Sequence, residues 1–372
     1  LERARKDGDD AEWTRALVEE TKLRMALHGY ETAVRYLRTQ EWPEDAVSQA
    51  VLELYYANSL ATYARVYSWE IRSRERVDTS GELDLKKWDL EQIVEEADRA
   101  FLSVWSARAE WGSESLGELS RYIHQNNYPP RIRGALRDAV TYLWVELLAD
   151  SSMWSPAESN EVFRLDLTAL IDGDPKSSSK LNLADSGVHP LLKIGALLDD
   201  LEAWHGDSDR SEAALEARLE RLRRFNGAFE TAEDKLAIRT HLEELQARFD
   251  RSLEWWSMGQ ATLAELIREE SDPDALVRAR GAAIAGRDRH PQSIGGQRCR
   301  HIVASIEAPS YGVVAMATDG AGRRSFQISH RNVSGLHFRA WRYDLRRYVE
   351  DSEDYNLLPG HREAEKIMSG SP

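Results

Sequence analysis

The stretch "RRSFQISHRNVSGLHFRAWRYD" occupies Arg323–Asp344 and differs in pattern from most of the chain before it. Apolar and polar residues alternate in Phe326–Ser329 and again in Leu336–Ala340. A period of two is typical of β-strands, because successive side chains point to opposite faces. Asn332–Gly335 interrupts the alternation and contains the residues that turns require. The stretch therefore predicts two antiparallel strands joined by a turn at 332–335.

The residues around this stretch extend the β segment. "YGVVAMAT" begins at Tyr311 and predicts a further strand, and "DGAGR" at Asp319–Arg323 predicts a turn. Trp341 and Tyr343 fall on the opposite phase, which indicates a bulge or a strand covered on both faces. Three strands can bury one face, whereas a sandwich needs more. We therefore expect residues 309–372 to be the incomplete start of an antiparallel β-sandwich domain.

Residues 1–308 predict an α-helical, repeat-like region, since their apolar residues recur with the helical period. The last two helices of this region, around the turn His290–Ser293, resemble a tetratricopeptide-type hairpin. Single helical hairpins cannot bury a face alone, so a solenoid-like stack is expected. A loop at 172–187 is a possible subdomain boundary, placed near 172–188. The expected helices are 11–28, 31–39, a long run from Pro43 to about 76, 90–111, 115–127, 132–149, 191–204, 212–225, 231–249, 256–270, 273–289 and a last helix ending near 306.

Composition restricts the class of protein. The 372 residues are 42% hydrophobic with twelve Trp, which is enough for a core. No apolar run reaches the length of a membrane span. The chain begins at Leu1 without a signal sequence, so we expect a fragment or a trimmed chain.

Charge argues against a nucleic-acid partner, because the net charge is −15. It is unevenly spread: residues 296–347 carry nine Arg and three acidic residues, a net +6, which leaves −21 elsewhere. The basic segment is either a solvated face or a surface that docks an acidic neighbour.

Several groups of residues have a composition typical of sites, and none is assigned a catalytic, cofactor-binding or metal-binding role. Two groups combine carboxylates with an aromatic residue, as glycoside hydrolysis requires, but solvated helix faces explain them more simply. The single Cys299 lies beside His301 on helical positions that point apart, which favours a buried thiol over a metal ligand. The two groups are Asp199, Asp200 and Glu202 near Trp204, and Glu95, Glu96 and Asp98 near Phe101.

Three further motifs have simple structural explanations. Ser177–Lys180 has the spacing of some acyl enzymes but lacks companion motifs and falls in the expected loop. Gly295 and Gly296 open a helix, where close packing is more common than anion binding. Asn332 begins a glycosylation sequon that is expected to be accidental. Aromatic residues at helical spacing predict helix–helix core: Tyr55, Tyr56, Tyr63, Tyr67, Trp69, Trp255 and Trp256.

The junction of the two regions resembles bacterial alpha-2-macroglobulin-like proteins. The resemblance covers Gly286–Asp344 and rests on the last helix His290–Ile306, the exit "IEAPS" at Ile306–Ser310 and the segments "HRNV" and "HFRAWRYD". The helix around "WPEDAVSQAVLELYYANSLATYARVYSW" also resembles the helical region of that family. The resemblance implies a helical region followed by macroglobulin-type β domains.

The resemblance also implies a function in protease trapping. Such proteins present a bait segment, are cleaved, change shape and enclose the protease, and many carry a thioester in a Cys-Gly-Glu-Gln motif. Here Cys299 is followed by Arg300, so no thioester residue can be assigned. No bait segment can be identified in the sequence either. We expect a non-enzymatic N-terminal scaffold of an endopeptidase inhibitor, without cofactor, in the periplasm or cell envelope. Its partners would be downstream macroglobulin domains and, through the full-length protein, target proteases.

Two other functions stay open. The first is a free-standing helical-repeat scaffold for protein–protein interaction. The second is a helical enzyme acting on carbohydrate, which requires a Trp-lined groove with converging carboxylates.

Overall fold

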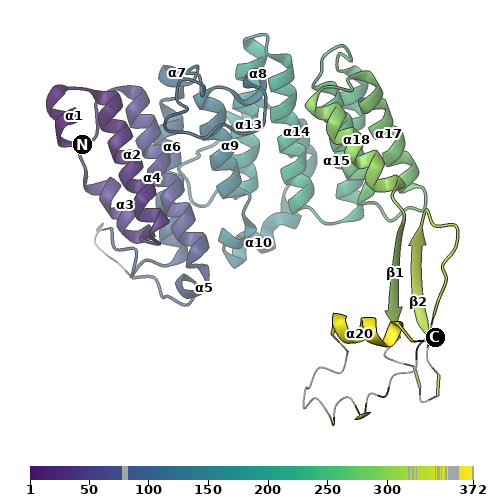
Figure 1. Cartoon of the computed structure of the whole chain (residues 1–372). Coiled ribbons are helices and arrows are strands. Elements are labelled where there is room, and N and C mark those ends of the chain that lie inside the picture. Colours follow the sequence, from purple (N-terminus) through teal and green to yellow (C-terminus); the bar gives the residue numbers. More distant parts are fainter. Residues whose placement is uncertain are drawn as a thin grey trace. The chain divides into compact units, whose positions relative to one another are not determined.

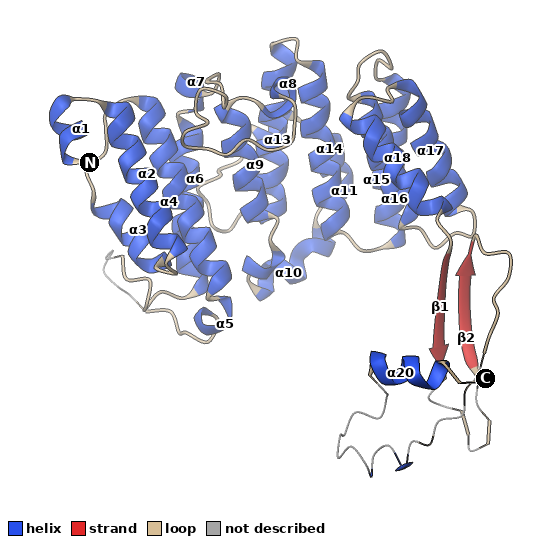
Figure 2. Ribbon diagram, viewed as in Figure 1, coloured by secondary structure: helices blue, strands red, loops and turns tan. Residues whose placement is uncertain are grey.

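The computed structural model describes residues 1–77, 83–316, 319–320, 322–323, 325–339, 341, 344, 346–347, 350 and 360–370. The protein is mainly α-helical, with a two-stranded antiparallel sheet near its C-terminal end (Figures 1 and 2). It divides into two compact units, Leu1–Val303 and Ala304–Pro372. The mainly α fold class with a small β region, as expected from the sequence, is confirmed. Residues 172–188 lie inside the first unit.

The first unit begins with five helices, of which α2 and α4 have a side-chain cap at the N-terminus. Asp9 accepts a hydrogen bond from the Glu12 amide at the start of α2, and Asp45 does the same for the Ser48 amide at the start of α4. Such caps satisfy amide groups that would otherwise lack a partner. The helices are α1 (Glu2–Asp7), α2 (Asp10–Ala26), α3 (Tyr30–Thr39), α4 (Ala46–Val66) and α5 (Ser68–Ile71).

The middle of the unit has shorter elements, several of which were not expected from the sequence. The helices are α6 (Leu90–Ser106), α7 (Arg108–Trp111), α8 (Pro130–Arg133), α9 (Leu136–Leu148), α10 (Pro156–Glu161), α11 (Leu167–Asp172) and α12 (Pro175–Ser178). Two 3₁₀ turns, η1 (Ser151–Met153) and η2 (Val162–Arg164), flank α10. The expected loop at 172–187 therefore contains a helical turn, α12.

The second half is regular. It consists of α13 (Pro190–Asp207), α14 (Ser211–Ala228), α15 (Ala232–Arg248), α16 (Trp256–Arg268), α17 (Ala275–Arg289) and α18 (Ile294–Glu307). Each expected helix is present here, with ends shifted by a few residues.

Helices of this unit pack mainly on their neighbours in sequence. α2 and α3 contact α4, and α4 contacts α6. α6 then contacts α9, α9 contacts α13, α13 contacts α14, α14 contacts α16, and α16 contacts α17. Figure 1 shows them standing side by side. The core is continuous through this row, and its largest fully buried side chains include Trp111, Trp144 and Trp255. The row fixes the side chains on its surface in stable positions.

The expected helix at 115–127 is wrong. The backbone there makes turns, and its start bonds to a distant segment instead: the Leu116 amide donates to the Gly134 carbonyl and the Leu136 amide to the Glu114 carbonyl, each at 2.8 Å. The Tyr122 hydroxyl also donates to the Ala11 carbonyl at 2.9 Å. Tertiary hydrogen bonds outweigh the weak local preference for helix.

The second unit contains a β-hairpin. Strands β1 (Ser310–Ala315) and β2 (Phe326–Arg331) pair antiparallel, with Val313 opposite Ile328. A short helix, α20 (His361–Met368), lies near the C-terminus. Of the strand expected at 311–318, residues 311–315 are confirmed as part of β1, and Ala317 and Thr318 lie outside the described residues. The strand expected at 326–329 is confirmed as part of β2.

The second expected hairpin, turning at 332–335, is wrong. Residues 336–339 have no strand, and Ala340 and Tyr343 lie outside the described residues. Asn332 has a positive φ of 54°, and its side-chain amide donates to the Ile306 carbonyl at 2.8 Å. β2 pairs with β1 along one edge, and residues 336–339 do not pair with its other edge. Asn332 is instead tied to the end of α18, and its side-chain amide also lies 3.5 Å from the Ala308 carbonyl.

Candidate functional site

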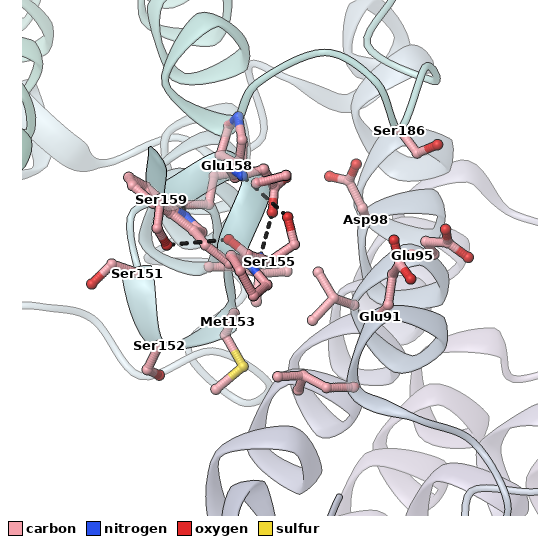
Figure 3. Close-up of a pocket in the computed structure, with 18 of the residues that line it drawn as sticks. Glu91, Glu95, Asp98, Ser151, Ser152, Met153, Ser155, Glu158, Ser159 and Ser186 are labelled. Carbon is pink, nitrogen blue, oxygen red and sulfur yellow. Dashed lines mark hydrogen bonds between the residues drawn. The ribbon is translucent and has the colours of Figure 1, made fainter. Parts of the chain in front are cut away.

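A cavity of the first unit lies between α6 and the segment that carries η1 and α10. We call it the α6 cleft; its volume is about 950 Å³. Figure 3 shows Glu91, Glu95 and Asp98 along one wall, and Ser155 and Glu158 on the facing wall. Leu147, Leu148 and Met153 add apolar surface, so the cleft is amphipathic.

The acidic wall follows from the sequence of α6. Asp89 caps the helix in a capping box with Gln92, which fixes where the helix begins. Ile93, Ala97 and Phe101 bury the opposite stripe against the core. Glu91, Glu95 and Asp98 are spaced four and three residues apart, so they share one face. Their side chains are 62%, 37% and 16% exposed, so this stripe, the α6 stripe, runs from the rim to the floor of the cleft.

The facing wall is held by local caps rather than by a core of its own. Ser155 and Glu158 form a capping box at α10, and Pro156 occupies the first turn. His189 joins this wall to α13: its Nε2 lies 2.9 Å from the Glu158 carbonyl, and its Nδ1 accepts the Leu191 amide at 3.1 Å. The Trp154 ring packs against His189 with centroids 5.3 Å apart. These bonds position a wall that α10 itself does not anchor.

The floor of the cleft contains an ion pair. Lys193 of α13 lies 2.5 Å from Asp98, and its side chain is only 5% exposed. Asp98 also accepts a hydrogen bond from the Trp144 indole. This carboxylate is therefore committed to two partners that hold α6, α9 and α13 together.

The rim contains a more exposed ion pair. Arg76 donates to Glu91 at 2.9 Å and to Glu95 at 3.1 Å, and its side chain is 52% exposed. The interaction with Glu95 is the largest cause of the raised pKa of Arg76. Exposed pairs of this kind contribute about 1 kcal/mol or less to stability.

A second cavity adjoins the cleft. It has a volume of about 600 Å³ and lies between α10–η2 and the end of α14. Ser151, Trp154 and Ser159 line both cavities. We call it the α14 cavity; Phe163 lines it and is 77% exposed. The two cavities thus lie on either side of one short segment.

The charged groups of the cleft fit the binding of a ligand better than the cleavage of a glycosidic bond. Each carboxylate of the α6 stripe faces a cation, and the aromatic residue among the cleft's described lining is Trp154. A glycosidase-type pair would need carboxylates that differ in protonation and converge on one bond. The described residues contain no group of three or more His, Cys, Asp or Glu placed to hold a metal ion.

Of the carboxylates predicted as candidates near Phe101, only part reaches the cleft. Glu95 and Asp98 line it, whereas Glu96 bonds to the Tyr56 hydroxyl at 2.7 Å and to Arg99. Burial raises the pKa of Tyr56, and the Glu96 carboxylate adds to that rise. Sequence reasoning missed Glu91 and the facing wall, although the Ser155–Glu158 capping-box spacing was a usable signal.

The carboxylates near Trp204 do not form a site. Asp199 pairs with Arg221, Asp200 with Arg108 and Arg137, and Glu202 with Arg218. The expectation of solvated faces is wrong for Asp199, which is 3% exposed. A buried carboxylate needs a cation, and α14 supplies it through Arg221.

Cys299 is buried, as expected. Its thiol lies 3.4 Å from the Ser257 carbonyl, while His301 is exposed, so the two do not share a ligand site. Burial raises the pKa of the Cys299 thiol to about 12.

The two glycines at the start of α18 serve packing. A Cβ on Gly295 would lie 2.2 Å from the Met258 amide nitrogen, and one on Gly296 would lie 1.9 Å from the His290 carbonyl oxygen. The Gly296 amide donates to the Ser293 hydroxyl, which occupies the place of an anion. Ser177 lies in the short α12, and Lys180 is exposed.

The aromatic residues are mostly core, as the spacing predicted. Tyr56, Tyr63, Trp255 and Trp256 are buried. Trp69 is the correction: it is 90% exposed, because α4 ends at Val66 and the chain turns before it.

No family model, no curated protein and no solved structure matches the chain. No helix in the described part of the chain is both long enough and apolar enough to cross a membrane.

Proposed function

We propose that this chain is the N-terminal scaffold part of an alpha-2-macroglobulin-like endopeptidase inhibitor and performs no covalent chemistry itself. One observation carries the proposal. A helical row is followed at once by a β-hairpin with an apolar face that no described residue covers.

The hairpin has two chemically different faces. The register places Tyr311, Val313 and Ala315 opposite His330, Ile328 and Phe326, on one face. Gln327, Ser329 and Arg331 lie on the other face, which is polar apart from Val314. Tyr311 is 70% exposed and Phe326 is 64% exposed, and none of the described residues after Glu307 is buried.

A hairpin of this kind needs a cover. Two strands alone are marginally stable in water, and one-sided strands pack against a second sheet in β-sandwiches. The hairpin therefore supports the start of a larger β domain. The resemblance at 286–344 supports the alpha-2-macroglobulin-like family. The partners proposed from it are downstream macroglobulin domains and target proteases, and the proposed location is the periplasm or cell envelope.

The coding sequence beyond residue 372 tests this proposal directly. We expect further segments with the strand period and, later, a bait-like segment. A stop codon after residue 372 would refute the proposal.

A protease assay on the longer gene product tests the inhibitor role. Trapping should block digestion of casein while cleavage of a small chromogenic peptide continues, because only large substrates are excluded. Residues 1–372 alone should leave both activities unchanged. Loss of both activities with the longer product would indicate an active-site inhibitor instead.

A second candidate function is a free-standing helical scaffold for protein–protein interaction. The α6 cleft favours it, because an amphipathic groove on a row of helices is a common binding surface. The same coding sequence separates the two functions.

A further inference from the structure

We propose that the α6 cleft and the α14 cavity form one groove that binds an extended, cationic segment of a partner protein. This inference does not rest on the macroglobulin proposal, since it uses only residues of the first unit. It follows from the size, the charge and the weak anchoring of this region.

The size of the groove points to an extended ligand. A small-molecule pocket typically has about 300–1,000 Å³. The α6 cleft alone has about 950 Å³, and the α14 cavity adds about 600 Å³ next to it. Shared lining by Ser151, Trp154 and Ser159 places the two cavities next to each other across the segment that carries η1 and α10. An occupant that fills both must be long rather than compact.

The charge of the cleft points to a cationic ligand. Carboxylates outnumber cations here: the described lining contains Asp89, Glu91, Glu95, Asp98, Glu158 and Glu161 against Arg72, Arg74 and Lys193, and Arg76 at the rim adds a fourth cation. The cations are already engaged, Arg72 with the Ser152 carbonyl, Arg74 with Glu70 and Lys193 with Asp98. A charge of one sign within a cleft attracts the opposite charge and speeds association.

The rim can exchange its cation at low cost. Arg76 is half exposed where it meets Glu91 and Glu95, so solvent already weakens both ion pairs. A lysine or arginine of the partner can take its place and form similar ion pairs with Glu91 and Glu95. Asp98 differs, because Lys193 and the Trp144 indole hold it on the floor. Glu91 and Glu95 are therefore the residues that would recognise the ligand.

The segment between the two cavities can adapt to a ligand. Neither α10 nor η2 contains a buried residue, so moving this segment exposes little apolar surface. Phe163 offers a large apolar side chain on the side of the α14 cavity. Aromatic residues in such positions commonly anchor a bound chain. The partner segment thus needs apolar residues as well as cations.

Binding of a labelled peptide tests the proposal. The probe is a fluorescein-labelled peptide of four Lys-Leu-Ser repeats, measured by fluorescence anisotropy, with a Glu-Leu-Ser peptide as its counterpart. We expect saturable binding of the lysine peptide only. The double variant Glu91→Gln/Glu95→Gln should weaken it about tenfold, and raising ionic strength from about 0.05 M to about 0.3 M should weaken it further.

The matched control is Glu19→Gln/Glu20→Gln on α2, which removes the same charge from an exposed helix outside the groove. We expect this control to bind the peptide as the unmodified chain does. Hydrogen exchange should show protection at 151–161 and 186–190 when the lysine peptide is bound.

Three results would overturn the proposal. The first is equal weakening by both double variants, which would mean attraction to overall charge. The second is unchanged exchange at 151–161 with bound peptide. The third is spermidine competing at concentrations equal to the peptide, which would mean a site for small polyamines. None of these results affects the macroglobulin proposal, which the coding sequence beyond residue 372 tests.

Discussion

Arg133 at the end of α8 donates a 2.6 Å hydrogen bond to Glu216 of α14, and the Glu216 side chain has no exposed surface. Arg223 donates to the same carboxylate at 3.0 Å, and the Trp255 indole at 2.7 Å. Burial works to raise the pKa of Glu216, but Arg223 and Arg133 outweigh it and lower the pKa. This buried cluster joins α8, α14 and the start of α16.

Removing the charge of Glu216 should destabilise the first unit strongly. Glu216→Gln leaves Arg133 and Arg223 buried with one carboxylate fewer, which typically costs about 3–5 kcal/mol. Urea unfolding followed by circular dichroism measures the loss. Glu243→Gln is the control, because its partner Arg239 also pairs with Glu270, and we expect less than about 0.5 kcal/mol. Similar losses in both variants would contradict the role of the cluster.

Stability should fall in acid through Glu220. Burial works to raise its pKa, yet Arg133, Arg223 and Arg224 lower it to about 2. A carboxyl whose folded pKa is depressed stabilises the fold above its unfolded pKa, and that stability is lost as pH falls toward about 2. The contribution is on the order of 3 kcal/mol. Urea midpoints between about pH 5 and pH 2.5 measure it. Glu220→Gln should show a shallower acid slope, and an unchanged slope would contradict the prediction.

Cys299 should be inert in the folded protein. Burial raises the pKa of its thiol to about 12, so little thiolate forms near neutral pH. Reaction with Ellman's reagent should be at least about a hundredfold slower in buffer than in urea. Fast reaction in the folded state would show that α16, α17 and α18 open readily around it.

The sequence predicted the helices where an apolar stripe and a cap coincide. α6 is an example, because Asp89, Gln92 and the buried stripe from Ile93 to Val104 all agree. It failed at 115–127, where the hydrogen bonds of Leu116 and Glu114 go to residues about twenty positions away. Periodicity reports local packing and does not report such pairing.

The candidate site was only half visible in the sequence. Glu95 and Asp98 stood out beside Phe101, and helical spacing places them on one face with Glu91. The facing wall comes from residues 151–161 and from the loop before α13, and His189 joins them. No local pattern shows that these segments meet α6. Long-range placement of that kind depends on the whole row of helices.

Two glycines should respond in opposite directions to alanine. Gly295→Ala places a Cβ 2.2 Å from the Met258 amide nitrogen, so α16 and α18 must separate, at a cost of about 1–3 kcal/mol. Gly281→Ala in α17 meets nothing within 4 Å and should gain about 0.5–1 kcal/mol from helix propensity. Thermal melts of both variants check the pair. Destabilisation by Gly281→Ala would mean that its surroundings are more crowded than described.

Removing residues 309–372 should leave the helical unit folded. Ile306 is the last buried residue among those described, so the truncation removes no described core side chain. The helical signal per residue should rise, and the free energy of unfolding in urea should change by less than about 0.5 kcal/mol. Phe326→Asp in the complete chain should likewise leave the midpoint unchanged, since Phe326 is 64% exposed. In a longer gene product the same substitution should destabilise the β domain by about 2 kcal/mol or more, because there the apolar face would be covered. A clear loss of helical stability in the truncated chain would show that the two units share a core.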